Sequence, residues 1–339
     1  NTVKMELYLD SVNLDEIKAA SKLGYLTGLT TTPTFMVREG VKDINTQMLE
    51  IAKYVDVLQV EALGDNAEEI VAEANRLVDM GLSKESTVFK IPVSLEGTRA
   101  CKMLVNQGMM VNLHLVYTLQ QAYMAFAAGA TYVCPLVGRL QDQGHDALGL
   151  VADCVDVVEK YGYNSKIMFS SVRNVEHVRN ALDIGVHTVT VPWKIMQKLT
   201  ENHFTTIGTN QFIEDTRILT NYAGDVAQKD EVTISKHKKV IDALLVMTKS
   251  NLGAVAILND DESIFRVFTD GDLRRLMNEH DGEVHDLGLA DLGAQTPLSI
   301  DADASLYEAK NMFHDKGVDS LVVTKGDTFI GILDIQHVI

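Results

Sequence analysis

Short apolar runs alternate with longer segments of helical period over the first two-thirds of the chain. The runs are rich in β-branched residues and predict eight strands, at residues 6–9, 25–29, 55–60, 87–91, 111–115, 132–135, 166–169 and 188–191. Between them, the helical period recurs at residues 15–23, 67–80, 96–107, 119–128, 149–161 and 175–182. This order predicts an α/β fold, the (β/α)8 or TIM barrel. An open doubly wound sheet is the alternative, but no GxGxxG segment follows the first predicted strand.

The last third of the chain follows a different plan. A helical stretch at residues 210–220 runs into the polar segment AGDVAQKDE, so we expect a first domain at 1–220 and a linker at 221–231. Residues 232–339 contain two approximate repeats, about 232–282 and 290–339. Each repeat has an amphipathic helix, a strand, a turn, a second strand and the start of a helix. The two repeats predict a smaller α+β domain in which they complete one core together.

Composition and charge narrow the class of protein. The chain has 339 residues, of which 46% are hydrophobic, and a formal net charge of −17. This charge argues against a nucleic-acid partner, because such proteins concentrate lysine and arginine on one face. No apolar run reaches the roughly 18 residues of a membrane span, and the first residues lack the pattern of a signal peptide. We therefore expect a cytoplasmic protein with no membrane partner.

Cysteine and histidine spacing gives no sign of a metal site. Cys101, Cys134 and Cys154 are widely spaced without a CxxC pair, which is typical of reduced, buried thiols. No HExxH motif occurs, and His177 and His187 are ten residues apart. We expect no metal and no other cofactor.

Two ionisable residues on predicted barrel strands are candidates for catalysis. In such barrels the carboxyl ends of the strands surround the open mouth, where active sites form. Lys90 lies within the apolar run VFKIPVS, where a lysine must be neutralised, ion-paired or used. A neutral amine can attack a carbonyl to form a Schiff base, and Asp10 could act as general acid and base. The alternatives are an ion pair or an edge residue for Lys90, and a counter-ion or helix cap for Asp10.

Charged and hydroxyl side chains near the ends of the last strands suit a phosphate group. Arg139 follows the sixth predicted strand, and Ser171 and Arg173 follow the seventh. Two arginines with a hydroxyl match a dianion, and barrels often bind phosphate at their last strands. Taken singly, each arginine would more often be a solvated surface charge.

Several segments together resemble one enzyme family. LYLDSVN, TGLTTTPT, LQVEA, VFKIPVSLEG, NLHLVYTLQQA, AGATYVCPLVGRLQDQG and KIMFSSVRNVEHV occur in that order and are similar to the small-subunit transaldolases, including fructose-6-phosphate aldolase. The resemblance covers about residues 5–220. It implies a (β/α)8 barrel and metal-independent Schiff-base chemistry that cleaves or transfers a dihydroxyacetone unit from a ketose phosphate.

The resemblance also implies roles for single residues. Lys90 matches the Schiff-base lysine and Asp10 the acid/base carboxylate, while Gln59 falls where the family positions the catalytic water with Gln or Glu. The residues that match the acceptor-phosphate site are Arg139, Ser171 and Arg173.

Some positions depart from the family pattern. Thr32 replaces an asparagine that hydrogen-bonds a substrate hydroxyl, and a threonine cannot reproduce the paired donor and acceptor of that amide. Asn112 matches the asparagine of the fifth strand, and Thr118 replaces a serine; both are predicted to bind substrate. His114 replaces a threonine and could take a proton-transfer role, or be a packed histidine. Leu136 replaces a tyrosine that helps to hold water, which favours transfer over simple cleavage.

The two C-terminal repeats, the first closed by FRVFTDGDLRR, resemble a tandem pair of CBS domains, like those fused to sugar-phosphate isomerases and nucleotidyltransferases. In CBS domains a Thr-x-x-Asp pattern often holds the ribose of an adenine nucleotide, and Thr269 and Asp272 fit it. The second repeat has Asp334 and His337 at these places, so at most one site is complete. The alternative is a pair that serves only for dimerisation.

These observations predict a Schiff-base transaldolase of carbohydrate metabolism, as in the pentose phosphate pathway, with sugar phosphates as substrates and an adenine nucleotide at the CBS pair. One alternative is a fructose-6-phosphate aldolase-type lyase of altered donor specificity, for example one that makes an unusual sugar. Another is a non-catalytic regulator that binds a phosphosugar and a nucleotide. The family resemblance also implies a homo-oligomer.

Overall fold

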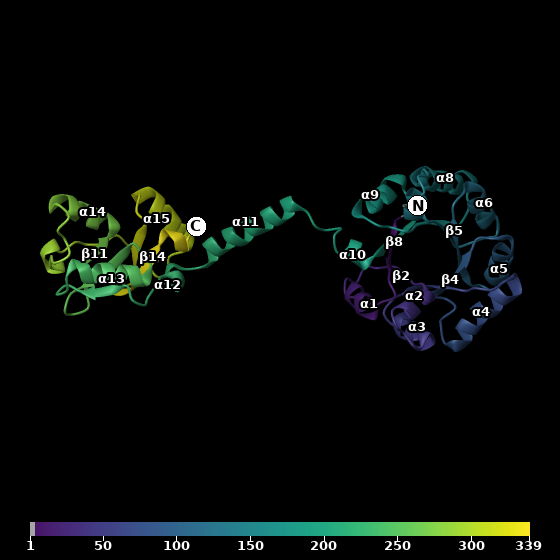
Figure 1. Cartoon of the computed structure of the whole chain (residues 1–339), viewed down its shortest axis with the longest axis horizontal. Helices are drawn as coiled ribbons and strands as arrows, with labels where there is room; N and C mark the ends of the chain where they lie inside the picture. The colour runs from purple at the N-terminus through teal and green to yellow at the C-terminus, as the bar shows by residue number, and fades with distance from the viewer. Residues whose placement is uncertain (1–3) are drawn as a thin grey trace. The chain divides into compact units, whose positions relative to one another are not determined.

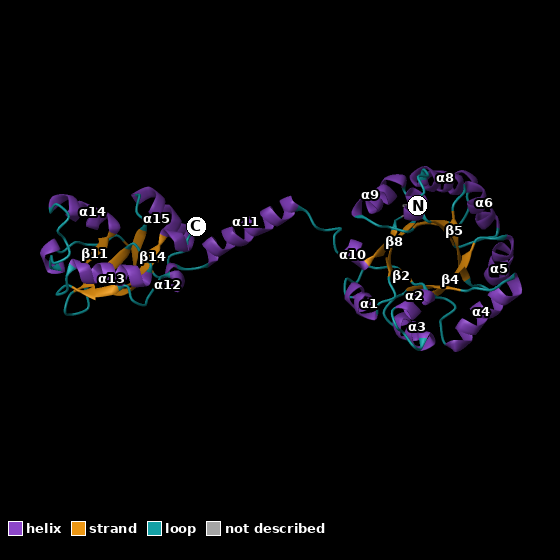
Figure 2. Ribbon diagram, in the orientation of Figure 1, coloured by secondary structure: helices purple, strands orange, loops and turns teal. Residues whose placement is uncertain are grey.

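Eight parallel strands in the first part of the chain close into a barrel, each paired with the next and β8 with β1 (Figures 1 and 2). The structure is a computed structural model that describes residues 4–339. The strands are β1 (Glu6–Asp10), β2 (Gly28–Thr30), β3 (Val57–Glu61), β4 (Thr87–Pro92), β5 (Met110–Val116), β6 (Tyr132–Pro135), β7 (Lys166–Phe169) and β8 (Thr188–Pro192). The predicted (β/α)8 barrel is confirmed.

Helices surround this ring of strands, as Figure 2 shows in purple around orange. They are α1 (Leu14–Ser21), α2 (Pro33–Arg38), α3 (Ile44–Ala52), α4 (Ala67–Met80), α5 (Leu95–Asn106), α6 (Leu119–Ala127), α7 (Val137–Asp142), α8 (Ala147–Tyr161), α9 (Val175–Ile184) and α10 (Trp193–Met196). Polar side chains such as Asn66, Ser94 and Asn174 accept a backbone N–H at the helix starts, which satisfies donors that have no partner within the helix.

The barrel unit is packed in two layers. Most buried apolar side chains lie between the strands and the helices, as expected where apolar strands carry amphipathic helices. A smaller cluster fills the barrel itself and comprises Tyr8, Val88, Tyr132, Cys134 and Met168. Within it, the hydroxyls of Tyr8 and Tyr132 lie 2.8 Å apart. The barrel is therefore filled beneath its mouth, and a ligand can enter only from the strand ends.

The second part of the chain contains two small sheets with the same arrangement of strands. Its helices are α11 (His203–Thr220), α12 (Ala223–Val226), α13 (Val240–Ser250), α14 (Asp270–Glu279) and α15 (Leu306–Lys316), with short 3-10 turns η1 (Leu289–Leu292) and η2 (Ile335–His337). Its strands are β9 (Thr233–Ser235), β10 (Ala254–Leu258), β11 (Ile264–Thr269), β12 (Ser299–Asp301), β13 (Ser320–Lys325) and β14 (Thr328–Asp334). In each sheet the central strand pairs with a parallel and an antiparallel neighbour, which confirms the two repeats.

Each repeat has a buried apolar cluster of its own, and a further cluster joins the two repeats. Val232, Ala254 and Ala256 of the first repeat pack with Ile332 of the second. Neither sheet of three strands could bury its apolar face alone, which is why the two repeats behave as one domain.

The chain divides earlier than the expected boundary at residue 220. The compact units are Asn1–Glu201 and Asn202–Ile339. The reason is that α11 buries only Ile218, which packs with Phe313 and Leu333 of the second unit. The segment 221–231, expected to be a linker, also belongs there, because Ala223 and Ala227 are buried in the same cluster. Its polar composition concealed these small buried residues.

The cysteines and the helices were also subjects of prediction. All three cysteines are buried, as expected for structural thiols, and burial raises the pKa of Cys134 to about 11. Within residues 4–339, no helix combines the length and the apolar character that crossing a membrane requires.

Candidate active site

A cavity of about 390 Å³ opens at the mouth of the barrel, where the strands end. It is lined by Asp10, Thr30, Thr32, Phe35, Glu61, Lys90, Asn112, His114, Leu115, Cys134, Leu136, Arg139, Met168, Ser170, Ser171 and Thr190. These residues come from the ends of all eight strands or from the segments that follow them. The structure thus brings together Lys90, Asp10 and most of the other predicted site residues.

Lys90 is half-buried in the wall of this cavity, on β4. Its cross-strand neighbours are Glu61 on β3 and Asn112 on β5, which also line the cavity. The only hydrogen bond of its Nζ within the described residues is a long one, 3.5 Å, to the carbonyl oxygen of Thr31. No carboxylate within residues 4–339 forms a salt bridge with the amine, so it is available to a ligand.

Asp10 ends β1 and faces the same cavity. Its side chain is open to the solvent of the mouth, but the surrounding protein removes much of its hydration, and this burial raises the pKa of the carboxyl. The positive charge of Lys90 and a hydrogen bond donated by Thr30 Oγ1 at 3.3 Å oppose the rise. A carboxyl whose pKa moves toward neutrality is suited to both accepting and donating a proton.

Gln59 and Asn112 form a buried amide pair at the base of the site. Asn112 Nδ2 donates to Gln59 Oε1 at 2.7 Å, and neither side chain is exposed. Gln59 Nε2 and Asn112 Oδ1 have no partner among the described residues, although both are buried. Asn112 lines the cavity, whereas Gln59 lies one position below it, beside Val88 in the sheet. The expected role of Gln59 in holding water stays a prediction.

His114 presents a neutral imidazole to the cavity. It is buried, and burial together with the charges of Lys90 and Arg139 lowers its pKa to about 3. Its Nε2 has no hydrogen-bond partner within residues 4–339. The expected proton transfer relied on titration near neutrality, whereas this environment lowers the pKa, and the role stays a prediction. His114 is also placed to exchange a hydrogen bond with a ligand. The next residue, Leu115, has φ of 58°, an uncommon conformation that is often found at functional sites.

Three positions that depart from the family pattern, namely Thr32, Leu136 and Thr118, have different surroundings. Thr32 precedes α2 but makes no capping hydrogen bond, so its side chain is free to meet a ligand in the cavity. Leu136 adds an apolar surface to the cavity. Thr118 is exposed and lies outside the lining, and its hydroxyl accepts the N–H of Gln121 at 3.2 Å as the cap of α6. Its predicted contact with substrate therefore gains no support from this geometry.

Of the three residues predicted to bind phosphate, two line the cavity and one does not. Arg139 on α7 and Ser171 after β7 line it. Arg173 is half-exposed, forms a salt bridge with Asp142 and is not part of the lining. Sequence reasoning could not find this pairing, because Asp142 lies on a different element, 31 residues away.

Some lining residues were not among the predicted site residues. Thr30 and Thr190 hydrogen-bond to each other across β2 and β8, and Thr30 also supports Asp10. Glu61 adds a second carboxylate, and Cys134 was expected to be purely structural. All four lie on strands near the mouth, so examining each strand end in turn could have found them.

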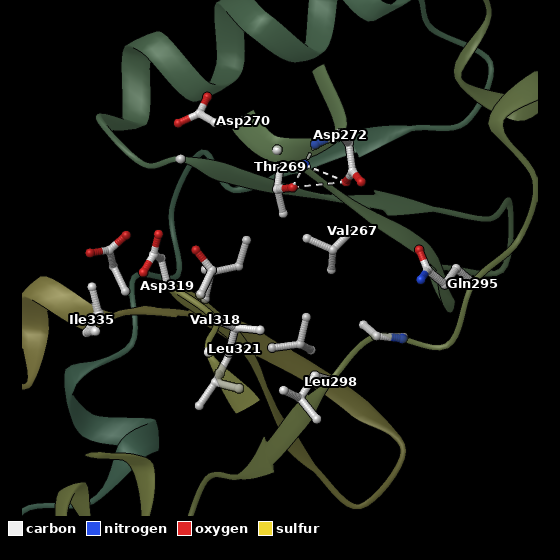
Figure 3. Close-up of a pocket in the computed structure, with 18 of the residues that line it drawn as sticks. Val267, Thr269, Asp270, Asp272, Gln295, Leu298, Val318, Asp319, Leu321 and Ile335 are labelled. Carbon is white, nitrogen blue, oxygen red and sulfur yellow. Dashed lines mark hydrogen bonds between the residues drawn. The ribbon is translucent and has the colours of Figure 1, made fainter. Parts of the chain in front are cut away.

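A second cavity, of about 760 Å³, lies between the two repeats of the second unit (Figure 3). Apolar side chains of both repeats, including Val267, Leu298 and Leu321, face it in Figure 3. Thr269 and Asp272 line it too, and dashed lines in Figure 3 mark the bonds between them. The structure thus brings the predicted nucleotide residues into a cavity with an apolar floor.

Asp272 is already engaged by its own helix. Its carboxylate accepts the N–H of Thr269 at 2.9 Å and lies 2.5 Å from Arg275. In the second repeat, Asp334 occupies the place of Thr269, and its carboxylate accepts the N–H of Gln336 at 2.8 Å. The N–H of Asp334 is donated to His337 Nδ1 at 3.1 Å. The two ends of the cavity therefore have the same backbone plan but different side chains.

Proteins of known family resemble both parts of the chain. A probable transaldolase of Streptococcus equi subsp. equi is 37% identical over 212 residues, which are 62% of this chain and 97% of that protein. A probable transaldolase of Desulforudis audaxviator is 38% identical over the same shares of the two chains. A CBS-domain containing protein of Agrobacterium tumefaciens, of solved structure, overlaps 35% of this chain and 92% of its own with 15% identity and a TM-score of 0.33.

Two family profiles match the chain, and their matches overlap at residues 223–248. The CBS domain profile matches residues 223–279 and 289–339, so both C-terminal repeats are CBS domains, and the first begins inside the expected linker. The profile of Transaldolase/Fructose-6-phosphate aldolase matches residues 7–248, most of the chain. The sequence motifs, the closed barrel and the relatives agree, and the chain belongs to the transaldolase/fructose-6-phosphate aldolase family.

Proposed function

We propose that the protein is a Schiff-base transaldolase that transfers a dihydroxyacetone-type unit between phosphorylated sugars. The observation that carries this proposal is the shared cavity of Lys90 and Asp10, which also contains Arg139. An unpaired amine, a carboxyl with a raised pKa and a guanidinium are the three groups that this reaction needs.

The donor half of the reaction starts at Lys90. The amine of Lys90 attacks the ketone carbon of the donor, and loss of water leaves an iminium ion that draws electrons from the neighbouring carbon–carbon bond. Asp10 takes the proton of the hydroxyl beyond that bond. The carbon–carbon bond breaks and an aldose leaves. The electron pair of the broken bond stays on the donor fragment, which remains attached to Lys90 as an enamine.

The acceptor half reverses these steps. The enamine carbon attacks the aldehyde of an aldose phosphate, and Asp10 returns its proton to the new hydroxyl. Water then attacks the iminium ion and releases the product ketose from Lys90. Arg139 and Ser171 would hold the acceptor phosphate, because a guanidinium and a hydroxyl both donate to phosphate oxygens.

Three residues of the cavity lining support a donor specificity different from that of the family pattern. Thr32, His114 and Leu136 line the cavity together, and each replaces a residue of different hydrogen-bonding capacity. Leu136 offers no hydroxyl to hold water, which supports transfer over hydrolytic release of the donor unit. A lyase of the fructose-6-phosphate aldolase type is the second candidate. The yield of free dihydroxyacetone with and without an acceptor aldehyde distinguishes them.

Trapping of the covalent intermediate tests the proposal. The wild type is incubated with fructose 6-phosphate, sedoheptulose 7-phosphate or dihydroxyacetone, reduced with borohydride and weighed by mass spectrometry. We expect an adduct in the wild type and none in Lys90→Ala. Lys166→Ala is the matched control, because Lys166 forms a salt bridge with Glu6 at the start of β1, away from the mouth. No adduct with any donor would favour a regulator that binds phosphosugars without catalysis.

The cavity of the second unit supports binding of an adenine nucleotide as the regulatory part of this proposal. Its apolar floor suits a base, and Asp272 beside Thr269 could accept hydrogen bonds from a ribose. Calorimetric titration of the full chain with AMP tests this. No heat of binding for the wild type would favour a CBS pair that serves for dimerisation.

A further inference from the structure

A buried histidine connects the two segments that carry the proposed phosphate ligands. His177 is 4% exposed and lies in the first turn of α9. Its Nδ1 accepts the backbone N–H of Arg173 at 3.0 Å, in the segment that follows β7 and contains Ser171. Its Nε2 lies 2.7 Å from Oε1 of Gln141, on α7, the helix that carries Arg139.

These two contacts fix the proton on the ring. Because Nδ1 accepts from a backbone N–H, the proton of the neutral imidazole is on Nε2 and is donated to Gln141. Burial, assisted by the charge of Arg173, lowers the pKa of His177, in agreement with a neutral ring. The backbone of His177 is itself fixed, because its N–H is donated to the capping side chain of Asn174 at 2.9 Å.

The segments joined by His177 are in close contact. A Cβ on Gly138 would lie 2.3 Å from the carbonyl oxygen of Ser171, so α7 approaches this segment as near as the backbone allows. Ser171 has φ of 57°, which is unfavourable for a residue with a side chain and needs support from its surroundings. Arg173 adds a salt bridge to Asp142 at the end of α7. The separation of Arg139 and Ser171 thus depends on how these segments are held.

We propose that His177 is a positioning residue that sets Arg139 and Ser171 for the phosphate of the acceptor and thereby gives the enzyme its preference for phosphorylated aldehydes. The inference rests on the proposed function. His177 does not line the cavity and contacts no reacting atom, so its effect is confined to the phosphate end. The Schiff-base chemistry at Lys90 is independent of it.

The test compares two acceptors that differ only in their phosphate, glyceraldehyde 3-phosphate and glyceraldehyde. The measured quantity is the ratio of kcat/KM for the two. In His177→Phe we expect this ratio to fall about tenfold, the effect of losing about 1.4 kcal/mol of hydrogen bonding, with kcat/KM for glyceraldehyde unchanged. In His177→Asn, whose side-chain oxygen can replace Nδ1, part of the preference should return.

Gln141→Leu removes the second hydrogen bond of His177, the one made by its Nε2. Because Gln141 is exposed, we expect this variant to fold even if His177→Phe does not. We expect the ratio to fall about threefold in it, consistent with one hydrogen bond. His187→Phe is the matched control, because His187 Nδ1 accepts the N–H of Ile167 at 2.9 Å in the same manner, but at the start of the strands, away from the mouth. Its ratio should equal that of the wild type.

The possible results separate this inference from the function on which it rests. Equal losses for both acceptors in Gln141→Leu, or an unchanged ratio in both His177→Phe and Gln141→Leu, would overturn the positioning role. If Arg139→Ala removes the preference while these variants keep it, the phosphate site stands and only the inference fails. If the wild type has no preference for the phosphorylated acceptor, or no activity, the inference and the proposed phosphate site both fail.

Discussion

At the scale of single residues, covalent bonding and proton transfer are assigned to two different side chains of one cavity. Asp10→Asn separates them, because an amide cannot accept the hydroxyl proton but preserves the shape of the site. We expect the borohydride adduct on Lys90 to persist while kcat falls about a hundredfold to ten-thousandfold, the range for loss of a general acid or base. Mass spectrometry and steady-state kinetics measure the two effects.

Glu61→Gln is the matched control for this change, since Glu61 is the other carboxylate of the cavity lining and neighbours Lys90 in the sheet. Its effect on kcat should be far smaller. Equal losses in the two variants would mean that Asp10 is not the acid and base of the reaction.

The burial of His114 predicts a loss of stability in acid. The folded-state pKa is about 3, whereas an unfolded histidine titrates near 6.5, so below pH 6.5 only the unfolded chain takes up the proton. The free energy of unfolding should therefore decrease as the pH is lowered, by about 2 kcal/mol at pH 5 for this residue alone. In His114→Gln the decrease between pH 7.5 and pH 5 should be smaller by about that amount.

Urea unfolding followed by the fluorescence of Trp193 measures this effect in the barrel unit, because the chain has a single tryptophan. His145→Gln, at an exposed position, is the control and should show the decrease of the wild type. The assignment of a buried, neutral His114 fails if both variants behave alike.

What the sequence could predict at this scale depended on how local the signal was. Lys90 within an apolar strand and Asp10 at a strand end are visible in the sequence, and the structure places both in one cavity. The neutral state of His114 was not visible, because it follows from burial, together with charges on β4 and α7, and only the closed barrel produces both.

At the scale of elements, long periodic segments were predictable and short ones were not. The helix predicted at 67–80 is α4, with the same limits. The six-residue helices α2 and α7 were missed, because one and a half turns give no periodic pattern. The omission did not hide the site residue that α7 carries, since Arg139 was predicted from its place after the sixth strand.

Gly138→Ala tests the contact of α7 with the segment after β7. The new Cβ would meet backbone, the carbonyl oxygen of Ser171 at 2.3 Å, so α7 must move and Arg139 must move with it. We expect a loss of about 1–3 kcal/mol of stability together with a weaker preference for phosphorylated acceptors. Thermal unfolding by circular dichroism and acceptor kinetics measure the two effects.

Gly208→Ala is the control, because Gly208 lies within α11 and nothing is within 4 Å of the added Cβ. A glycine-to-alanine change in an open helical position should stabilise by about 0.5–1 kcal/mol. If Gly138→Ala were as harmless as this control, the proposed tight contact of α7 would be refuted.

At the scale of the whole molecule, composition predicted the two domains but not where they end. The repeats were visible because their order of helix and strands recurs, and in the structure one apolar cluster contains side chains of both. The ends of the domains were less visible, because α11 and α12 are tied to the second unit by a few small or isolated apolar residues such as Ile218 and Ala223.

The charge of the CBS cavity predicts which adenine nucleotide the full chain prefers. Its lining has four aspartates, at 270, 272, 319 and 334, against Arg274 and Arg275. Arg275 is already paired with Asp272 at 2.5 Å, and no salt bridge involves Arg274 within residues 4–339. One unpaired cation among carboxylates can balance a single phosphate, and each further phosphate adds repulsion. We therefore expect affinity to fall from AMP to ADP to ATP in calorimetric titrations without magnesium.

Arg274→Ala should weaken the binding of AMP more than that of adenosine, because only the phosphate loses its partner. Added salt should reduce the difference between the two affinities. Lys249→Ala, which removes a cation that pairs with Glu231 outside the cavity, should leave both affinities unchanged. Tightest binding of ATP would mean that the aspartates of the lining do not face the phosphates.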